Sequence, residues 1–211
     1  MIIDEEQVMA LILAAGYSSR MDRFKPLAML GSMTALERCV ILFADCGIED
    51  VLVVVGHRHD EITRLIDQRL NARHVLNSRF HEGMFSSVKT GLSSLEYTPK
   101  AFFILPVDIP LVSRNTIHRL VDAFDSNRAD VYYPCFRGRR GHPPLISGSL
   151  IKGILDFSGD GGLRGYLKDK TALNVEVPDE HILMDMDVPA QYFDLVRRLE
   201  NSDAASDTDG N

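Results

Sequence analysis

Short apolar runs that end at turn residues, separated by segments with helical periodicity, are the feature that most constrains the fold of this chain. The runs are 8–13, 51–55, 101–105 and, more weakly, 131–133. A strand that is buried on both faces has such a continuous apolar run. Between the runs, apolar residues recur three or four positions apart, which is typical of one buried helix face. Strands that alternate with amphipathic helices predict an α/β fold with a mostly parallel sheet.

Four helices are predicted from this spacing, and their apolar faces begin at Leu36, Ile62, Ile117 and Tyr192. Ser113 precedes the third set and is a suitable N-cap. Pro189 precedes the fourth set and suits the first turn of a helix. The length of 211 residues is that of one domain, which we expect to span residues 1–200. Residues 201–211 contain no core-forming residue, so we expect them to be a disordered acidic tail.

Charge and cysteine content bound the possible functions. The net charge is −7, which argues against non-specific nucleic-acid binding and against a membrane-surface role. The three cysteines form no CxxC pair, which favours a reducing compartment. Cys39 and Cys46 fall within a helical apolar pattern and are expected to be buried. The run 8–15 is too short to cross a bilayer and follows acidic residues, so we expect a cytoplasmic protein.

The loop that follows the first apolar run contains the groups that a polyphosphate requires. Ligands of parallel sheets bind beyond the carboxyl ends of the strands. Small residues let the backbone approach a ligand, and successive N–H groups can point at phosphate oxygens. Arg20 and Lys25 add positive charge, while Ser18 and Ser19 add hydroxyl donors. The loop has neither a Walker A ending nor GxGxxG spacing. The alternative interpretation is an ordinary strand-to-helix loop with basic surface residues.

Carboxylates in two distant segments are candidate metal ligands. Asp108 follows an apolar run, so it is expected at the carboxyl edge of the sheet. Mg²⁺ typically takes one or two protein carboxylates together with phosphate oxygens and water, and Asp108 is the first predicted ligand. Asp185 and Asp187 are two residues apart, so in an extended segment both face one side. The alternatives are a turn aspartate at 108 and charge pairing with a helix N-terminus at 185 and 187.

The loop sequence resembles that of a known enzyme superfamily. Residues 13–27 contain Leu-Ala-Ala-Gly, then Ser, Arg-Met and Lys-Pro-Leu. This string is similar to the signature of nucleotidyltransferases with a glycosyltransferase-A-like fold, and is closest to the molybdenum cofactor branch. The branch usually has Gly after Arg-Met, where this chain has Asp22. The resemblance implies a single Rossmann-like α/β domain with a central mixed, mainly parallel sheet flanked by helices. It also implies nucleotide-binding roles for Leu13, Ala14, Ala15, Gly16, Arg20 and Lys25.

The acidic segments extend this resemblance. Residues 106–110 match the family's Pro-x-Asp-x-Pro motif, whose aspartate binds magnesium. Residues 185–189 are similar to the Asp-x-Asp-Thr-Pro segment, whose second aspartate completes the metal site, although Val188 replaces the threonine. The resemblance therefore implies that Asp108 and Asp187 bind Mg²⁺. Asp185 is expected to lie next to these ligands without binding the metal itself. It implies catalytic roles for Arg20, Lys25 and Asp108.

Two further strings imply where the substrates bind. Residues 82–92 are similar to a Gly-Met-Ser-Ser-Ser helix start, which places Gly83, Ser86 and Ser87 near the nucleoside. Plain N-capping by serine is the alternative. The string Gly-Arg-Arg-Gly-His-Pro in residues 138–143 resembles the cytidylyltransferase branch, where this region receives the acceptor. Arg140 and His142 are therefore expected to contact the acceptor, and a solvated basic loop is the alternative.

Taken with these matches, the resemblance implies a Mg²⁺-dependent transfer of CMP from CTP to a molybdopterin-type acceptor with release of pyrophosphate. A guanylyltransferase of the same cofactor and a sugar-phosphate or alditol-phosphate nucleotidyltransferase are alternatives. A non-catalytic carrier or chaperone of molybdenum cofactor, which would bind a molybdenum hydroxylase client, is an alternative of another class. We expect nucleoside triphosphate, with CTP favoured, and this acceptor as partners, with no nucleic acid and no membrane.

Overall fold

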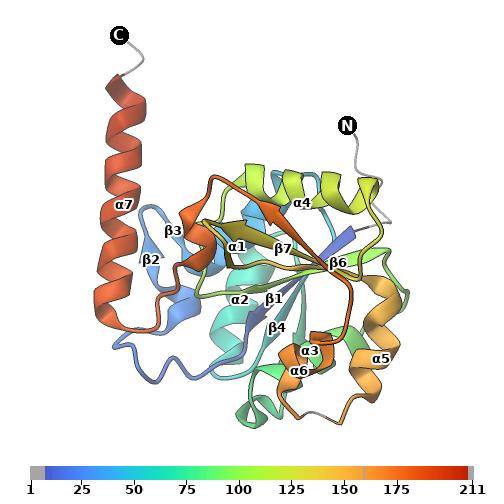
Figure 1. The fold of residues 1–211 in the computed structure, drawn as a ribbon. Helices are drawn as coiled ribbons and strands as arrows, with labels where there is room; N and C mark the ends of the chain where they lie inside the picture. Colours follow the sequence, from blue (N-terminus) through green and yellow to red (C-terminus); the bar gives the residue numbers. More distant parts are fainter. Residues whose placement is uncertain (1–7, 159, 209–211) are drawn as a thin grey trace.

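The strands of the central sheet run in the order β10-β7-β9-β6-β1-β4-β5, with β8 paired to β7 (Figure 1). The computed structural model describes residues 8–158 and 160–208. The strands are β1 (Val8–Ala14), β4 (Val51–Val55), β5 (Arg73–Leu76), β6 (Ala101–Pro106), β7 (Val131–Phe136), β8 (Arg139–Arg140), β9 (Leu145–Ser147) and β10 (Ala172–Glu176). β1 pairs in parallel with β4 and β6, as do β4 with β5 and β7 with β10. β9 runs antiparallel between β6 and β7, so the predicted mixed, mainly parallel sheet is confirmed.

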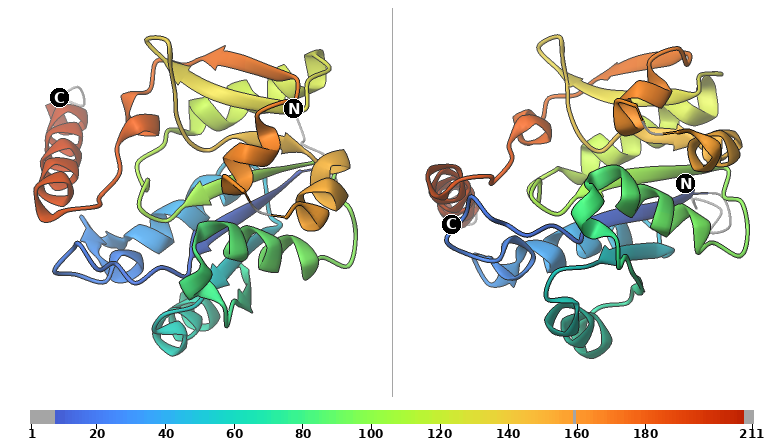
Figure 2. Two further views of the ribbon diagram at one scale, coloured as in Figure 1. Left: turned by 60° about the horizontal axis from the view of Figure 1, so that its bottom comes forward. Right: turned by 90° about the horizontal axis from the view of Figure 1, so that it is seen from below.

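Helices cover both faces of this sheet (Figure 2). They are α1 (Ala35–Ala44), α2 (His59–Arg69), α3 (Met84–Ser93), α4 (Arg114–Ser126), α5 (Ile151–Asp156), α6 (Gly162–Leu167) and α7 (Pro189–Thr208). The 3₁₀ turns are η1 (Lys25–Leu27), η2 (Phe80–Glu82), η3 (Gly148–Leu150) and η4 (Glu180–Leu183), and β2 (Met29–Leu30) pairs with β3 (Met33–Thr34).

Alternate residues of β1 point to opposite faces of the sheet. Ala10 and Ile12 pack with α1, α2 and α4, whereas Leu11 and Leu13 pack with α3, α5 and α6.

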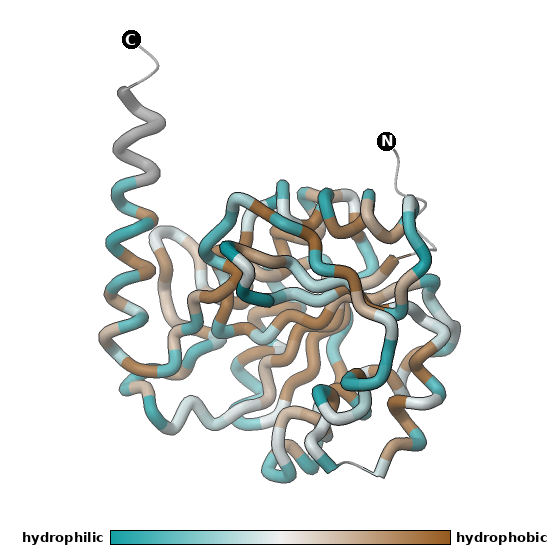
Figure 3. Tube along the Cα trace, viewed as in Figure 1, coloured by the Kyte–Doolittle hydropathy of each residue, from teal (hydrophilic) through white to brown (hydrophobic). Residues whose placement is uncertain are grey.

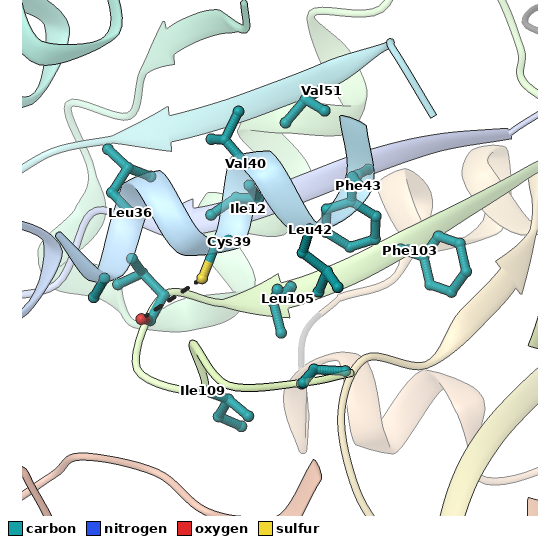
Figure 4. Close-up of a cluster of buried hydrophobic side chains, with 14 of the residues drawn as sticks. Ile12, Leu36, Cys39, Val40, Leu42, Phe43, Val51, Phe103, Leu105 and Ile109 are labelled. Atoms are coloured by element: carbon teal, nitrogen blue, oxygen red, sulfur yellow. Dashed lines mark hydrogen bonds between the residues drawn. The ribbon is translucent and has the colours of Figure 1, made fainter. Parts of the chain in front are cut away.

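The central strands are apolar along their whole length because both of their faces are covered (Figure 3). On one face, Leu36, Val40 and Phe43 of α1 lie against Ile12 and Phe103 of the sheet (Figure 4). The Cys39 thiol lies in the same layer, 3.9 Å from the Val107 carbonyl oxygen. Cys39 and Cys46 are both buried, as predicted. This layer is the larger part of the core and supports the carboxyl ends of β1 and β6.

Several helix boundaries follow from short-range chemistry. The Ser113 side chain accepts a hydrogen bond from the Thr116 N–H, so its predicted role as N-cap of α4 is confirmed. Thr34 and Glu37 form a reciprocal capping box at the start of α1. α7 begins at Pro189, as expected for a proline in the first turn. No helix in the described ranges is long and apolar enough to cross a membrane.

The C-terminal segment begins within the last helix. α7 continues to Thr208 and so includes residues 201–208 of the segment that is expected to be a tail. No glycine or proline interrupts the sequence between Pro189 and Gly210, and helix formation therefore meets no local break. Residues 209–211 of the expected tail lie outside the described residues. Figure 1 shows the far end of α7 standing away from the body of the protein.

Candidate active site

The loop after β1 is folded so that Lys25 begins η1. Ser18 organises it, because its hydroxyl oxygen accepts the Lys25 N–H at 3.0 Å and its carbonyl accepts the Met21 N–H at 3.0 Å. Met21 is buried and anchors the middle of the loop in the core. Ser18 itself has a φ of 56°. The loop therefore returns to the sheet edge, and the Lys25 side chain points at the ends of the neighbouring strands.

A backbone hydrogen bond joins the two acidic segments. The Met186 N–H donates to the Asp108 carbonyl at 3.0 Å, and the Met186 side chain is fully buried. Because the side chains of an extended segment alternate, burial of Met186 directs Asp185 and Asp187 away from the core. This link places Asp187 beside the end of β6, although the two aspartates are far apart in the sequence.

Lys25 lies between the two predicted metal ligands. Its ammonium nitrogen is 3.0 Å from Asp108 Oδ2 and 2.5 Å from Asp187 Oδ1. Arg20 approaches the other oxygen of Asp187 at 2.5 Å, and its side chain is 70% exposed. One basic loop and two distant acids therefore meet at a single point at the carboxyl edge of the sheet.

The charges of this cluster perturb one another. Burial lowers the pKa of Lys25, but hydrogen bonds to Asp187 and Asp108 outweigh it, and the pKa is raised overall. The hydrogen bond from Lys25 lowers the pKa of Asp187. Burial, followed by the nearby charges of Asp187 and Asp108, raises the pKa of Asp185. Three acids thus share one region, and the two cations that contact Asp187 offset part of their repulsion.

Gln191 in the first turn of α7 holds the second acidic segment in place. Its side-chain oxygen accepts the N–H groups of Asp187 at 2.8 Å and Val188 at 2.9 Å. Its amide nitrogen donates to Asp185 Oδ1 at 2.6 Å. Sequence reasoning did not identify this residue, and no local pattern distinguishes it from other glutamines near a helix start.

Two adjoining clefts meet at Asp108. The first has a volume of about 310 Å³ and contains Lys25, Tyr17 and Phe80 in its lining. The second has a volume of about 420 Å³ and contains Arg139, Asp185 and Asp187. Both are lined by Met84, Pro106 and Asp108. A ligand in one cleft therefore lies beside a ligand in the other, with the acidic cluster between them.

Most of the residues expected to bind nucleotide line the first cleft: Leu13, Ala14, Ala15, Gly16, Lys25, Gly83 and Ser87. Gly83 has a φ of +98°, a conformation that favours glycine. Arg20 lies in the second cleft instead. Ser86 lines neither cleft, because its hydroxyl is bonded to the carbonyls of Gly83 and Arg79. The alternative of N-capping by serine does not hold for α3, whose N-cap is Gly83.

The two residues expected to contact the acceptor, Arg140 and His142, line the second cleft. Arg140 donates to Asn174 Oδ1 at 2.7 Å and lies over the Tyr133 ring. The Nδ1 atom of His142 is buried and has no hydrogen-bond partner among the described residues. Burial lowers the pKa of His142 below its ordinary value of 6.5, so the ring is neutral at pH 7.

The donor set at the junction fits a hard divalent cation. Two carboxylates that share the Lys25 ammonium lie within reach of one ion, and oxygen is the ligand that Mg²⁺ prefers. Within residues 8–158 and 160–208, no group of three or more His, Cys, Asp or Glu side chains forms a complete metal site. The other ligands would therefore be phosphate oxygens and water.

The basic loop and the acid pair both lie at the carboxyl edge of the sheet, which is where α/β sheets bind their ligands. The chain belongs to the MobA-like NTP transferase domain family, which matches residues 10–176, and is thus a member of a nucleotidyltransferase family.

Two curated relatives match different shares of this chain. The bifunctional IPC transferase and DIPP synthase of Rubrobacter xylanophilus is 37% identical over 108 residues, which are 49% of this chain and 24% of that protein. The molybdenum cofactor cytidylyltransferase of Escherichia coli is 22% identical over 188 residues, 89% of this chain and 95% of that protein. The chain thus spans about a quarter of the first relative and nearly all of the second.

The fold is also similar to that of a solved nucleotidyl transferase, Mth528 from Methanothermobacter thermautotroptrophicus. The TM-score is 0.80 at 21% identity, and the match covers 93% of this chain and 99% of that one. At this identity the likeness concerns the fold.

Proposed function

We propose that this protein transfers CMP from CTP to a molybdopterin-type acceptor and releases pyrophosphate, with Mg²⁺ as its cofactor. The observation that carries the proposal is the meeting of Lys25, Asp108 and Asp187 where two clefts adjoin. A transferase needs a donor and an acceptor side by side, with positive charge at the transferred phosphate.

In this proposal the first cleft holds CTP. The backbone of residues 13–16 lies close to base and phosphates, while Ser87 and Gly83 lie at the nucleoside. Lys25 and Arg20 hold the pyrophosphate as it leaves. The Lys25 ammonium has three donors, so it can turn from a carboxylate to a phosphate oxygen without moving its backbone.

The second cleft holds the acceptor, with Arg140 and His142 in contact with it. An oxygen of the acceptor phosphate attacks the α-phosphorus of CTP and forms a new P–O bond. The bond from the α-phosphorus to the bridging oxygen of the β-phosphate breaks, and the electron pair leaves with pyrophosphate. The attacking oxygen already carries negative charge, so no general base is required.

Asp108 and Asp187 would hold Mg²⁺, which supplies positive charge to the donor phosphates when bound. Gln191 and the Met186–Asp108 backbone link keep the two carboxylates adjacent. This chain's own contribution is therefore positioning and electrostatic stabilisation, which dominate phosphoryl-transfer chemistry.

Two lines of support favour this donor and acceptor. The Gly-Arg-Arg-Gly-His-Pro string resembles the cytidylyltransferase branch, and its Arg140 and His142 line the second cleft. One curated relative that matches almost end to end is a molybdenum cofactor cytidylyltransferase.

The test is pyrophosphate release from CTP, GTP, ATP and UTP, each with and without molybdopterin and Mg²⁺. We expect CTP to be the best donor and release to require both additions. Preference for GTP would indicate the guanylyltransferase alternative. Nucleotide or pterin binding with no pyrophosphate release would indicate the non-catalytic carrier.

A different phosphorylated acceptor is a second candidate. The relative with the higher identity is a bifunctional IPC transferase and DIPP synthase, and its match is confined to 49% of this chain. Transfer of labelled CMP to a panel of alditol and sugar phosphates would separate this candidate, because a molybdopterin-specific enzyme would label none of them.

A further inference from the structure

Aromatic side chains from three segments meet at one end of the first cleft. The Tyr17 ring centroid lies 5.0 Å from that of Phe80 and 5.2 Å from that of His57. Tyr17 and Phe80 both line the cleft. Gly56 makes this meeting possible, because a Cβ atom there would lie 2.8 Å from Ala15 Cβ and 2.9 Å from Phe80 Cβ. Two other rings therefore support the Tyr17 ring at the cleft.

Tyr17 is the most open of the three rings. It is 53% exposed, whereas Phe80 and His57 are half-buried. The two half-buried rings hold the tyrosine in position and leave much of its surface free. Such a surface suits a second planar group, because aromatic rings prefer offset-stacked or edge-to-face contacts. The open side of Tyr17 is therefore available to a planar part of a ligand in the cleft.

The aromatic end of the cleft lies apart from its charged end. β6, β1 and β4 are consecutive neighbours in the sheet. Asp108 comes two residues after the end of β6, and His57 comes two residues after the end of β4. Neighbouring strands are about 4.8 Å apart, so these two positions are roughly 10 Å apart along the carboxyl edge. The first cleft thus has ions at one end and aromatic rings at the other.

We propose that Tyr17 is a substrate-binding residue, on whose ring the nucleobase of the donor stacks while the phosphates lie at Lys25 and Asp108. This inference rests on the proposed function and deepens it. A nucleoside triphosphate is planar and aromatic at one end and polyanionic at the other, which matches the two ends of the cleft. Every base has a π-face, so stacking on Tyr17 strengthens binding without choosing between bases.

Equilibrium binding of CTP and of inorganic tripolyphosphate, which has no base, separates the two ends of the cleft. Both are measured with Mg²⁺ and without acceptor. We expect Tyr17→Ala to weaken CTP binding roughly tenfold and to leave the Kd for tripolyphosphate within about twofold. Tyr17→Phe retains the ring and should bind CTP like the wild type. Phe193→Ala is the matched control and should change neither Kd, because Phe193 is also 53% exposed but lies outside the first cleft.

A Tyr17→Trp variant reports the contact itself, because the chain contains no tryptophan of its own. The indole retains an aromatic face, so this variant should still bind CTP. We expect CTP to quench its fluorescence and tripolyphosphate to leave the fluorescence nearly unchanged, since a base stacks on the indole and a phosphate chain does not. Should Tyr17→Ala fail to fold by thermal melting, Tyr17→Trp tests the same point.

An unchanged Kd for CTP in Tyr17→Ala would overturn the stacking role. An equal loss of affinity for CTP and tripolyphosphate would also overturn it, because the substitution would then act on the phosphate end of the cleft. Equal fluorescence changes with the two ligands in Tyr17→Trp would do the same. Failure of the wild type to bind any nucleoside triphosphate would contradict the proposed function instead, so the two failures are distinguishable.

Discussion

The ammonium nitrogen of Lys25 lies 3.0 Å from a carboxylate oxygen of Asp108, across 83 positions of sequence. The same nitrogen contacts Asp187, which is further along the chain by another large part of the domain. These contacts join the loop after β1, the end of β6 and the segment before α7 into one charged cluster.

Removing either partner of the first contact should impair turnover. We expect Lys25→Ala and Asp108→Ala each to lower the rate of pyrophosphate release by about 10²-fold or more, the loss typical of one preorganised electrostatic contact. Lys152→Ala is the matched control, because Lys152 is exposed and pairs with Asp156 on the surface. A rate near that of the wild type in either variant would remove the residue from the mechanism.

Lys25 and a divalent cation compete for the same carboxylate oxygens. Substitution by methionine retains the length of the side chain and removes its charge. We therefore expect Lys25→Met to bind Mn²⁺ more tightly than the wild type in the absence of nucleotide, by roughly tenfold or about 1.4 kcal/mol. Its turnover should nevertheless fall. Electron paramagnetic resonance of free Mn²⁺ measures the affinity, and weaker binding by Lys25→Met would show that lysine and metal do not share the site.

The strands that could be predicted from the sequence are the ones covered on both faces. β1, β4 and β6 consist of buried residues throughout, so they are continuous apolar runs. β5 and β10 lie at the two edges of the sheet and consist of exposed and half-buried residues, and β9 has three residues. Such segments carry little local signal. Their pairing depends on neighbours that are distant in sequence.

Some residues of the candidate site could likewise be predicted from the sequence, and others could not. The loop after β1 and Asp108 could be placed because carboxyl ends of parallel strands meet at one edge. Gln191 could not, because its importance lies in hydrogen bonds to a segment that only the fold brings near. The contacts of Ser86 could not be predicted either. The sequence placed Ser86 near the nucleoside, whereas in the structure its hydroxyl is directed to two backbone carbonyls.

His142 should affect binding of the acceptor and not of the nucleotide, because it lines the second cleft and not the first. We expect His142→Ala to raise the KM for molybdopterin about fivefold or more, the effect of losing roughly 1 kcal/mol of hydrogen bonding. The Kd for CTP should stay within about twofold. A large change in CTP affinity with an unchanged KM for the acceptor would assign His142 to the other substrate.

Asp179 is predicted to contribute to stability. It is 5% exposed and accepts from the Ser113 N–H at 2.8 Å and the Thr116 hydroxyl at 2.7 Å. Burial alone would raise its pKa, but hydrogen bonds from His181, Ser113 and Thr116 outweigh it and hold the pKa at about 2. We expect Asp179→Asn to lower the free energy of unfolding at pH 7 by about 1–3 kcal/mol.

The pH dependence of that loss has a defined sign. The pKa of Asp179 is lower in the folded than in the unfolded protein, so the carboxylate stabilises the fold above pH 4 and loses this effect as the pH falls towards 2. The deficit of Asp179→Asn in urea denaturation should therefore shrink on acidification. Asp122→Asn, at an exposed position of α4, should show no deficit at either pH. A deficit that is constant with pH would contradict the assignment.

The position of the metal in a complex with CTP tests the central claim most directly. Crystals grown with CTP and Mn²⁺ should show an anomalous difference peak between Asp108 and Asp187, with one oxygen of each within about 2.0–2.3 Å of the ion. Lys25 should then contact a phosphate oxygen. Ordered CTP in the first cleft, with the metal bound away from both carboxylates, would contradict the account.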